Sequence, residues 1–277
     1  MVRSAVNKTA LAKSLGISRG SLYYQPKREK IDEEIKAQIE SVMGDHPDYG
    51  HKRIALHLRL NKKRIRRVMK KYGLKPYRRK AKQPVKKEDT GKAVAAYKNL
   101  IAELLERKLI IRPGQVWCTD FTYIKFQGKF IYVATMIDLF TREIVGINIS
   151  RFHNRFLVMG ALEDAMKKHT APEIVHSDQG SEYDSADFTE YVRLIGSQMS
   201  MSEKASPWQN GYQESFYGHF KGEAGDLSRF ETIGELIEYI YSQMYYYNNK
   251  RIHSVLKITP FAKRQSFYQK HILVPSK

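Results

Sequence analysis

The sequence predicts a mixed α/β domain, with a five-stranded sheet flanked by helices, preceded by small all-α modules. Residues 115–150 contain three β-rich runs, and the segment after them alternates helical patterns with short β-type runs. Residues 8–73 instead show apolar residues at helical spacing between turn signals. These two sequence patterns predict different architectures for the N-terminal and C-terminal regions of the chain.

Positive charge is concentrated in the front of the chain. Residues 1–92 contain 26 Lys and Arg against 9 Asp and Glu, whereas residues 93–277 contain 22 against 20, within a net charge of +19. A region this basic favours a polyanionic partner, because neutralising phosphates releases counterions. A basic surface that serves only solubility is the alternative.

Residues 1–28 are predicted to be a partial helix-turn-helix. Within 8–24, a helix, a turn at Gly16 and a second helix capped by Ser18 are expected. Four residues are expected to form its apolar seam: Ala12, Leu15, Ile17 and Leu22.

Residues 29–75 are predicted to be a second helix-turn-helix that binds DNA. One helical face of 31–42 holds Ile31, Ile35, Ile39 and Val42, and helices over 51–60 and from a cap at Asn61 to Gly73 follow. The last helix has seven basic residues and no acid of its own, which favours docking on DNA over a solvated face. The DNA-binding candidates here are Lys62, Lys63, Arg64, Arg66, Arg67 and Lys70.

Residues 76–112 are predicted to be a basic linker followed by a helix over 93–108. Arg78 and Arg79 are further DNA-binding candidates, placed to lie along phosphates or in a minor groove.

Residues 113–265 are predicted to form the α/β domain, and 266–277 a C-terminal tail. Strands are expected in QVWCTDFTYIKF, KFIYVATMIDLF and EIVGINIS, and in the short segments 173–177 and 198–202. The expected helices span 155–168, 185–195, 209–222 and 232–247.

Three carboxylates stand at distinctive positions. Asp120 lies within the first apolar strand, Asp178 follows the short run Ile174–Val175, and Glu214 falls on a helix after a turn. Phosphoryl transfer with two metal ions requires hard oxygen ligands that converge from separate elements. Asp138 is the same kind of strand acid as Asp120, so strand position alone does not choose between them.

The motifs WCTDFTYIK, HSDQGSEY and NGYQESFYGHFK, in this order, resemble those of the retroviral-integrase superfamily. The resemblance is strongest to the second-frame (orfB-type) DDE transposases of bacterial two-frame insertion sequences, and it covers residues 8–265. As in that family, 35 residues separate the second Asp from the Glu, and Lys221 stands seven residues beyond Glu214. HPDYGHKRIALHL and YNNKRIHSVLKITP also resemble family segments.

The resemblance implies a ribonuclease H-like integrase catalytic core in which Asp120, Asp178 and Glu214 are catalytic and bind two Mg²⁺ ions, with Mn²⁺ as a substitute. Lys221 is implied to contact DNA and Asp138 to be a structural acid. His176 is expected either to orient a ligand of the site or contact the cut strand, or to form a structural hydrogen bond.

The implied function is Mg²⁺-dependent cleavage and strand transfer in DNA transposition and integration. The implied partner is double-stranded DNA, both terminal inverted repeats and target, bound by a homodimer or higher oligomer, with an upstream-frame product or fusion as a further partner. A non-catalytic sequence-specific DNA-binding regulator and a ribonuclease H-like nuclease that cuts without joining are the alternatives.

Composition indicates a reducing cytoplasm and no membrane partner, and the resemblance implies a bacterial, nucleoid-associated protein. Cys118 is the only cysteine, which excludes an internal disulfide, and no run of 18 apolar residues is present.

Overall fold

The computed structural model describes residues 7–23, 27–77, 97–202, 211–225 and 227–272. The chain divides into two compact units, Met1–Tyr77 and Arg78–Lys277, which are described separately. None of the described helices is long and apolar enough to cross a membrane. Arg78 and Arg79 lie outside the described residues.

The first helical pair is smaller than predicted. Helix α1 (Lys8–Ser14) begins at Asn7, whose side chain accepts hydrogen bonds from the first turn, and ends before Gly16, which adopts a left-handed conformation (φ 65°). The predicted second helix is only a 3-10 segment, η1 (Arg19–Tyr23), although Ser18 does cap it. The predicted seam holds only in part, because Ala12 is buried whereas Leu15 and Ile17 are 58% and 43% exposed. Five residues in 3-10 geometry present too narrow an apolar face to cover them.

The second helical group matches its prediction closely. It consists of α2 (Lys27–Asp45), α3 (His51–Leu58) and α4 (Lys62–Lys71). The Asn61 side chain accepts the Lys63 N–H at 2.8 Å, which confirms the predicted cap. The three helices pack around Ile35, Ile39, Val42, Ile54, Ile65, Val68 and Met69, all buried, whereas the predicted core residue Ile31 is 45% exposed.

The second unit is built on a five-stranded mixed sheet in the order β3-β2-β1-β4-β5. Strands β1 (Val116–Phe126), β2 (Lys129–Asp138) and β3 (Ile144–Ser150) form an antiparallel meander. Strands β4 (Ile174–Ser177) and β5 (Gln198–Met201) extend the sheet in parallel from β1. All five strands agree with the prediction from the sequence.

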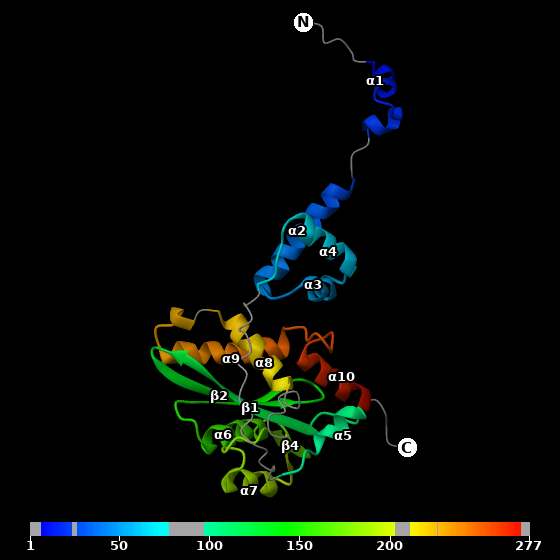
Figure 1. Cartoon of the computed structure of the whole chain (residues 1–277). Helices are drawn as coiled ribbons and strands as arrows, with labels where there is room; N and C mark the ends of the chain where they lie inside the picture. The colour runs from blue at the N-terminus through cyan, green and yellow to red at the C-terminus, as the bar shows by residue number, and fades with distance from the viewer. Residues whose placement is uncertain (1–6, 24–26, 78–96, 203–210, 226, 273–277) are drawn as a thin grey trace, which may run out of the picture. The chain divides into compact units, whose positions relative to one another are not determined.

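Helices cover both faces of this sheet (Figure 1). Helices α6 (Arg155–Met166) and α7 (Ala186–Leu194) pack on one face around Trp117 and Met136. Helices α8 (Gly211–Ala224) and α9 (Ile233–Asn249) pack on the other face around Val133 and Ile137. Alternate residues of β1 and β2 therefore enter two separate apolar cores.

The remaining elements differ from the prediction in extent. Of the predicted helix 93–108, residues 93–96 lie outside the described residues, and in the rest α5 spans Ile101–Glu106, where the Asn99 side chain accepts the first two N–H groups of the helix. Helix α10 (Pro260–Ile272) runs through the start of the predicted tail, so residues 266–272 are helical. A short 3-10 segment, η3 (Leu227–Arg229), joins α8 to α9.

Candidate active site

Asp120 lies on the central strand β1, opposite Thr135 of β2. Side chains alternate between the two faces of a strand, so Asp120 shares a face with Cys118 and Ile124. The side chains of Cys118 and Ile124 enter the cores on the α8 side of the sheet. The Phe121 N–H donates to one Asp120 carboxylate oxygen at 2.8 Å. The carboxylate is thus presented toward the helix that carries the third predicted acid.

Asp178 directly follows β4, the strand that pairs in parallel with β1. The last paired residues are Cys118 and His176, so the same register continued by two residues places Asp120 beside Asp178. Strands in a sheet lie about 4.8 Å apart. The Gly180 N–H donates to an Asp178 carboxylate oxygen at 3.0 Å. A Cβ at Gly180 would come within 3.1 Å of that oxygen, so this close turn favours glycine.

Glu214 and Lys221 both come from α8, seven residues apart. Glu214 is exposed and Lys221 is partly buried, with its ammonium 5.0 Å from the centre of the Tyr123 ring on β1. Residues seven apart in a helix share one face. Helix α8 therefore presents an acid and a cation toward the same edge of β1.

The electrostatics of Asp120 bring the predicted residues together. Burial and, after it, the charges of Asp178 and Glu214 raise the pKa of its carboxyl to about 7, against the lowering by the Phe121 N–H and by Lys221. The three carboxylates do not all lie within 4.8 Å of one another. The structure thus brings Asp178 and Glu214 near enough to Asp120 for their charges to act on its carboxyl.

Two residues that the sequence analysis missed fix the orientation of α8. The buried Gln213 side chain donates to the Cys118 carbonyl at 2.7 Å and accepts from the Thr135 hydroxyl at 3.1 Å. The Tyr217 hydroxyl donates to the Asp120 carbonyl at 2.7 Å and lies 2.9 Å from the Thr135 hydroxyl. Gln213 and Tyr217 are one turn apart and flank Glu214 in sequence, so their hydrogen bonds set the rotation of Glu214 about the helix axis.

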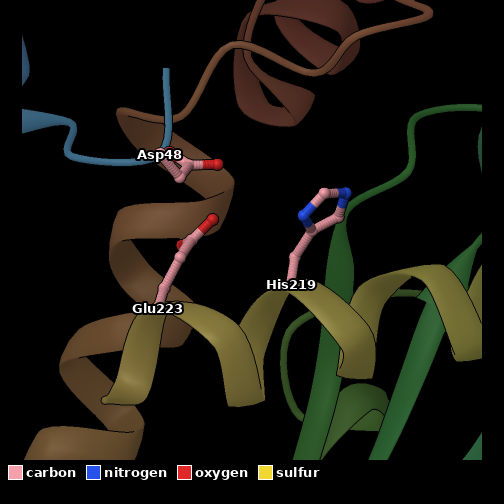
Figure 2. A group of neighbouring side chains, drawn as sticks. All are labelled: Asp48, His219 and Glu223. Atoms are coloured by element: carbon pink, nitrogen blue, oxygen red, sulfur yellow. The ribbon is translucent and has the colours of Figure 1, made fainter. Parts of the chain in front are cut away.

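The segment at the end of α9 attaches this helix to its neighbours. The Asn248 side chain forms two hydrogen bonds with the backbone of Ile144 on β3, at 2.8 and 2.9 Å. The buried Arg251 pairs with Glu223 of α8 at 2.8 Å. Figure 2 shows Glu223 and His219 one turn apart on α8; Asp48, also labelled there, belongs to the N-terminal unit and pairs with Arg53. The family-like motif YNNKRIHSVLKITP therefore holds the helix that carries Glu214.

His176 has structural contacts. Its Nδ1 lies 2.9 Å from the Ser200 hydroxyl, which accepts the Leu100 N–H at 2.9 Å. Burial lowers the pKa of the imidazole to about 4, so the ring is neutral at neutral pH. These contacts tie β4 to β5 and to the start of α5, which is the structural one of the two expected roles; a contact with DNA stays a prediction.

Asp138 is a structural acid, as the resemblance implied. Its carboxylate accepts the N–H groups of Gly114, Phe140 and Thr141 and the Thr141 hydroxyl, at 2.7–3.0 Å. Four donors tie the turn after β2 to the start of β1. The same carboxylate is therefore fully used within the fold.

The basic helix α4 is a candidate nucleic-acid interface in the N-terminal unit. All six of its predicted DNA-binding residues are exposed: Lys62, Lys63, Arg64, Arg66, Arg67 and Lys70. Arg67 differs, because it forms a two-pronged ion pair with the buried Asp32 of α2, at 2.5 and 2.7 Å, and Lys71 joins at 3.3 Å. The inference that no acid balances this helix is therefore corrected, since Asp32 balances two of its seven cations.

Comparison with protein families gives two matches to the catalytic half of the chain. Residues 111–207 match an integrase core domain, and residues 195–260 match a second integrase core model. The first match includes Asp120 and Asp178, and the second includes Glu214 and the end of α9.

Relatives cover almost the whole chain. The transposase for insertion sequence element IS904 of Lactococcus lactis is 34% identical over 245 residues, covering 85% of this chain and 95% of the relative. The transposase for IS629 of Shigella sonnei is 29% identical, covering 87% and 82%. A chain of the simian T-cell lymphotropic virus intasome structure is 12% identical with a TM-score of 0.50, covering 82% of this chain and 74% of that one. The last likeness supports the expected ribonuclease H-like fold.

Proposed function

This chain belongs to the DDE transposases of the integrase superfamily, and from this premise we propose that it cuts the ends of an insertion sequence and joins them to target DNA. Asp120, Asp178 and Glu214 are its catalytic residues. The observation that supports this most directly is the surroundings of Asp120, where burial and then the charges of Asp178 and Glu214 raise the pKa of its carboxyl. Carboxylates that are held close together despite burial and charge repulsion are typical of sites that bind a cation.

The acids fit a hard divalent cation. The donors are carboxylate oxygens from β1, from the loop after β4 and from α8, which is the ligand type that Mg²⁺ prefers. The integrase core family depends on divalent metals, and we propose two Mg²⁺ ions here, with Mn²⁺ able to replace them. When bound, the ions lower the pKa of the attacking oxygen and stabilise the leaving oxygen.

The residues of the chain then have distinct tasks. Asp120 on β1 and Asp178 in the loop directly after β4 would hold the ions, and Glu214 would complete the set from α8. Lys221 contacts a DNA phosphate beside them, because it shares the helix face of Glu214 and lies near enough to lower the pKa of Asp120. Water attacks first and frees a 3′-OH, and that hydroxyl attacks the target strand next. His176 keeps Asp178 in place from within the sheet.

DNA is held by the basic front of the chain. The exposed cations of α4 contact phosphates and position the second helix-turn-helix. We propose that Arg78 and Arg79 extend this contact along the backbone. The 1–28, 29–75, 76–112 and 113–265 segments are proposed as the functional divisions. An upstream-frame product is a proposed partner, and the nucleoid in the cytoplasm is the proposed location.

Cleavage of a labelled duplex that carries the element's terminal repeats, in Mg²⁺, tests this function. Asp120→Asn is expected to lower cleavage at least about 10³-fold while DNA affinity stays nearly unchanged, because metal ions supply several kcal/mol of transition-state stabilisation. Asp187→Asn, on the exposed surface of α7, is the matched control and should cleave normally. Wild-type cleavage by Asp120→Asn would refute the proposal. A second substrate with a recessed 3′-OH separates joining from cutting, and cutting without joining would favour a nuclease.

Assembly follows from the reaction, because two element ends must meet one target. We propose at least a dimer on DNA in which one subunit grips an end that another cuts. A mixture of Asp178→Asn chains with Arg64→Ala/Arg66→Ala chains should then recover cleavage that neither has alone. If every mixture stays inactive although each variant folds, cleavage in trans is wrong.

A further inference from the structure

A cavity of about 300 Å³ lies beside the N-terminal half of α8, within the second unit. Its walls come from six places in the chain: α5, the end of β2, the turn before β3, α8, the end of α9, and the segment that follows α9. None of the described residues that line the cavity is acidic. Two arginines, Arg142 and Arg251, and two histidines, His219 and His253, line it. The charged residues in its lining are therefore both arginines.

Arg142 is held so that its guanidinium faces this recess. Its backbone has a left-handed conformation (φ 63°) and its N–H donates to the Asp138 carbonyl at 2.8 Å. The guanidinium carbon lies 3.9 Å from the centre of the Tyr212 ring. Stacking of this kind leaves the edge of the guanidinium plane open to oxygen atoms.

One nitrogen of that guanidinium has no partner in the fold. Arg142 Nη1 is buried and makes no hydrogen bond within the described part of the chain. A buried donor without an acceptor costs about 1–3 kcal/mol, and more when it is charged. Because this nitrogen has almost no accessible surface, an anion in the cavity would meet the other atoms of Arg142, which is only partly buried and lines the cavity.

The other cations reinforce the same location. Burial raises the pKa of the Tyr247 hydroxyl to about 12, and Arg251 and Arg142 both act to lower it, so the two guanidinium groups flank one side chain. Arg251 uses its Nε to bind Glu223. Gly211 and Tyr212 also place the positive end of the α8 dipole at the cavity.

We propose that this cavity binds a phosphate group of the DNA backbone, separate from the phosphate that is cut. Arg142 is its principal ligand, Arg251 adds a second positive charge, and His219 lines the same wall. Ser215, which lines the cavity, directly follows Glu214, so the bound phosphate would fix the DNA strand to the helix that bears the third catalytic acid. The inference that the cavity binds a tetrahedral oxyanion depends on the cavity residues alone. The inference that this oxyanion belongs to DNA rests on the proposed function.

Salt dependence of DNA binding tests the proposal in the full-length protein. Fluorescence anisotropy with the labelled terminal-repeat duplex, without Mg²⁺, gives the slope of log K against log salt concentration. Arg142→Gln should reduce the size of this slope by about 0.9, the value for one lost phosphate contact. Arg142→Lys should keep the slope but bind more weakly, because it lacks the planar fork. Arg193→Gln, an exposed arginine paired with Glu190 on α7, is the matched control and should behave as wild type.

A second variant guards against misfolding of Arg142→Gln. Ser215→Asp keeps Arg142 and places an acid at the cavity, so it should weaken DNA binding as well. Unfolding midpoints of all variants are measured in parallel. An unchanged affinity and slope in both Ser215→Asp and a folded Arg142→Gln would overturn the proposal. Asp120→Asn should retain the full salt slope, which keeps this test separate from that of the catalytic residues.

Inorganic phosphate distinguishes a DNA phosphate from a free anion. The unfolding midpoint is measured in phosphate and in chloride at equal ionic strength, for wild type and Arg142→Gln. A small stabilisation by phosphate that Arg142→Gln removes, together with the reduced DNA slope, supports the proposal. The same stabilisation with an unaltered DNA slope would assign the cavity to a free oxyanion and overturn its assignment to DNA.

Discussion

Helices α4 and α8 each present charge on one side and bury the other, yet they are held in different ways. Helix α4 buries only apolar side chains, Ile65, Val68 and Met69, and its ion pairs with Asp32 lie at the rim. Helix α8 buries Gln213 and Tyr217 among its aromatic residues, and both form hydrogen bonds to the sheet. Apolar packing tolerates small rotations of a helix, whereas hydrogen bonds are directional.

This difference corresponds to the two tasks. Contacts with DNA phosphates are long, numerous and tolerant of position. Surface charge and packing through apolar side chains are therefore sufficient for α4 to bind DNA. A metal ligand must be placed within a fraction of an ångström, so α8 needs contacts that fix its rotation. The following predictions test whether that distinction is real, beginning with the largest effect.

The ion pair between Arg251 and Glu223 should be the most sensitive contact of α8. Arg251→Met leaves a half-buried carboxylate without its main partner and is expected to lower the free energy of unfolding by about 3–5 kcal/mol. Urea unfolding measures it. Arg251→Met/Glu223→Met should recover most of the loss, because neither charge then remains buried. A single variant that loses less than about 1 kcal/mol would mean that the pair does not hold α8.

Gln213 should affect catalysis more than its stability cost explains. Gln213→Ala leaves the Cys118 carbonyl and the Thr135 hydroxyl without this partner, which costs about 1–3 kcal/mol per unsatisfied group. Cleavage should fall about 10²-fold, because small displacements of a reacting group have effects of this size. Phe220→Leu, an apolar change in the same helix, should lose stability but little activity. Equal rate losses in both variants would make Gln213 an ordinary core residue.

The three acids could be proposed from the sequence, because their motif positions and the 35-residue spacing are properties of the chain itself; their catalytic role stays a prediction. The sequence was not sufficient for Gln213 and Tyr217, whose partners Thr135 and Asp120 lie 78 to 97 residues away. The pairing of Arg67 with Asp32, 35 residues earlier, was missed for the same reason. A buried polar contact depends on tertiary structure, and a Gln within an aromatic helix was the one local signal of it.

In the fold, too, local patterns were predicted correctly and contacts that depend on tertiary structure were not. Strand alternation and turn residues predicted all five strands, because period-two patterns are local. The failure at Leu15 and Ile17 arose because a helical pattern only 17 residues long was read as a complete pair of helices. Apolar spacing predicts which residues share a face, but not whether another element covers that face.

The arginines of α4 should separate into two groups. Arg64→Ala is expected to reduce the size of the DNA-binding salt slope by about 0.9 with little change in stability, because its side chain is exposed. Arg67→Ala should change the slope less and destabilise the helical group more, because Asp32 loses a two-pronged partner. Anisotropy and urea unfolding of both variants measure this. If the two arginines reverse these roles, α4 docks on DNA by a different face.

The smallest expected effect is a loss of stability of the α2–α4 pair at low pH. Hydrogen bonds from Arg67 and then Lys71 lower the pKa of the Asp32 carboxyl from 3.8 to about 2. A depressed pKa means that the unfolded chain takes up the proton first, so the pair stabilises α2 and α4 fully above pH 3.8 and progressively less as the pH falls toward 2. Hydrogen exchange of the α4 amides over this range should show opening increase in the wild type. Asp32→Asn should open more readily at neutral pH and lack this pH dependence, whereas Glu40→Gln, an exposed acid on α2, should follow the wild type. An Asp32→Asn chain with the same acid profile as the wild type would mean that Arg67 is not committed to Asp32, and that it is available to DNA like the other cations of α4.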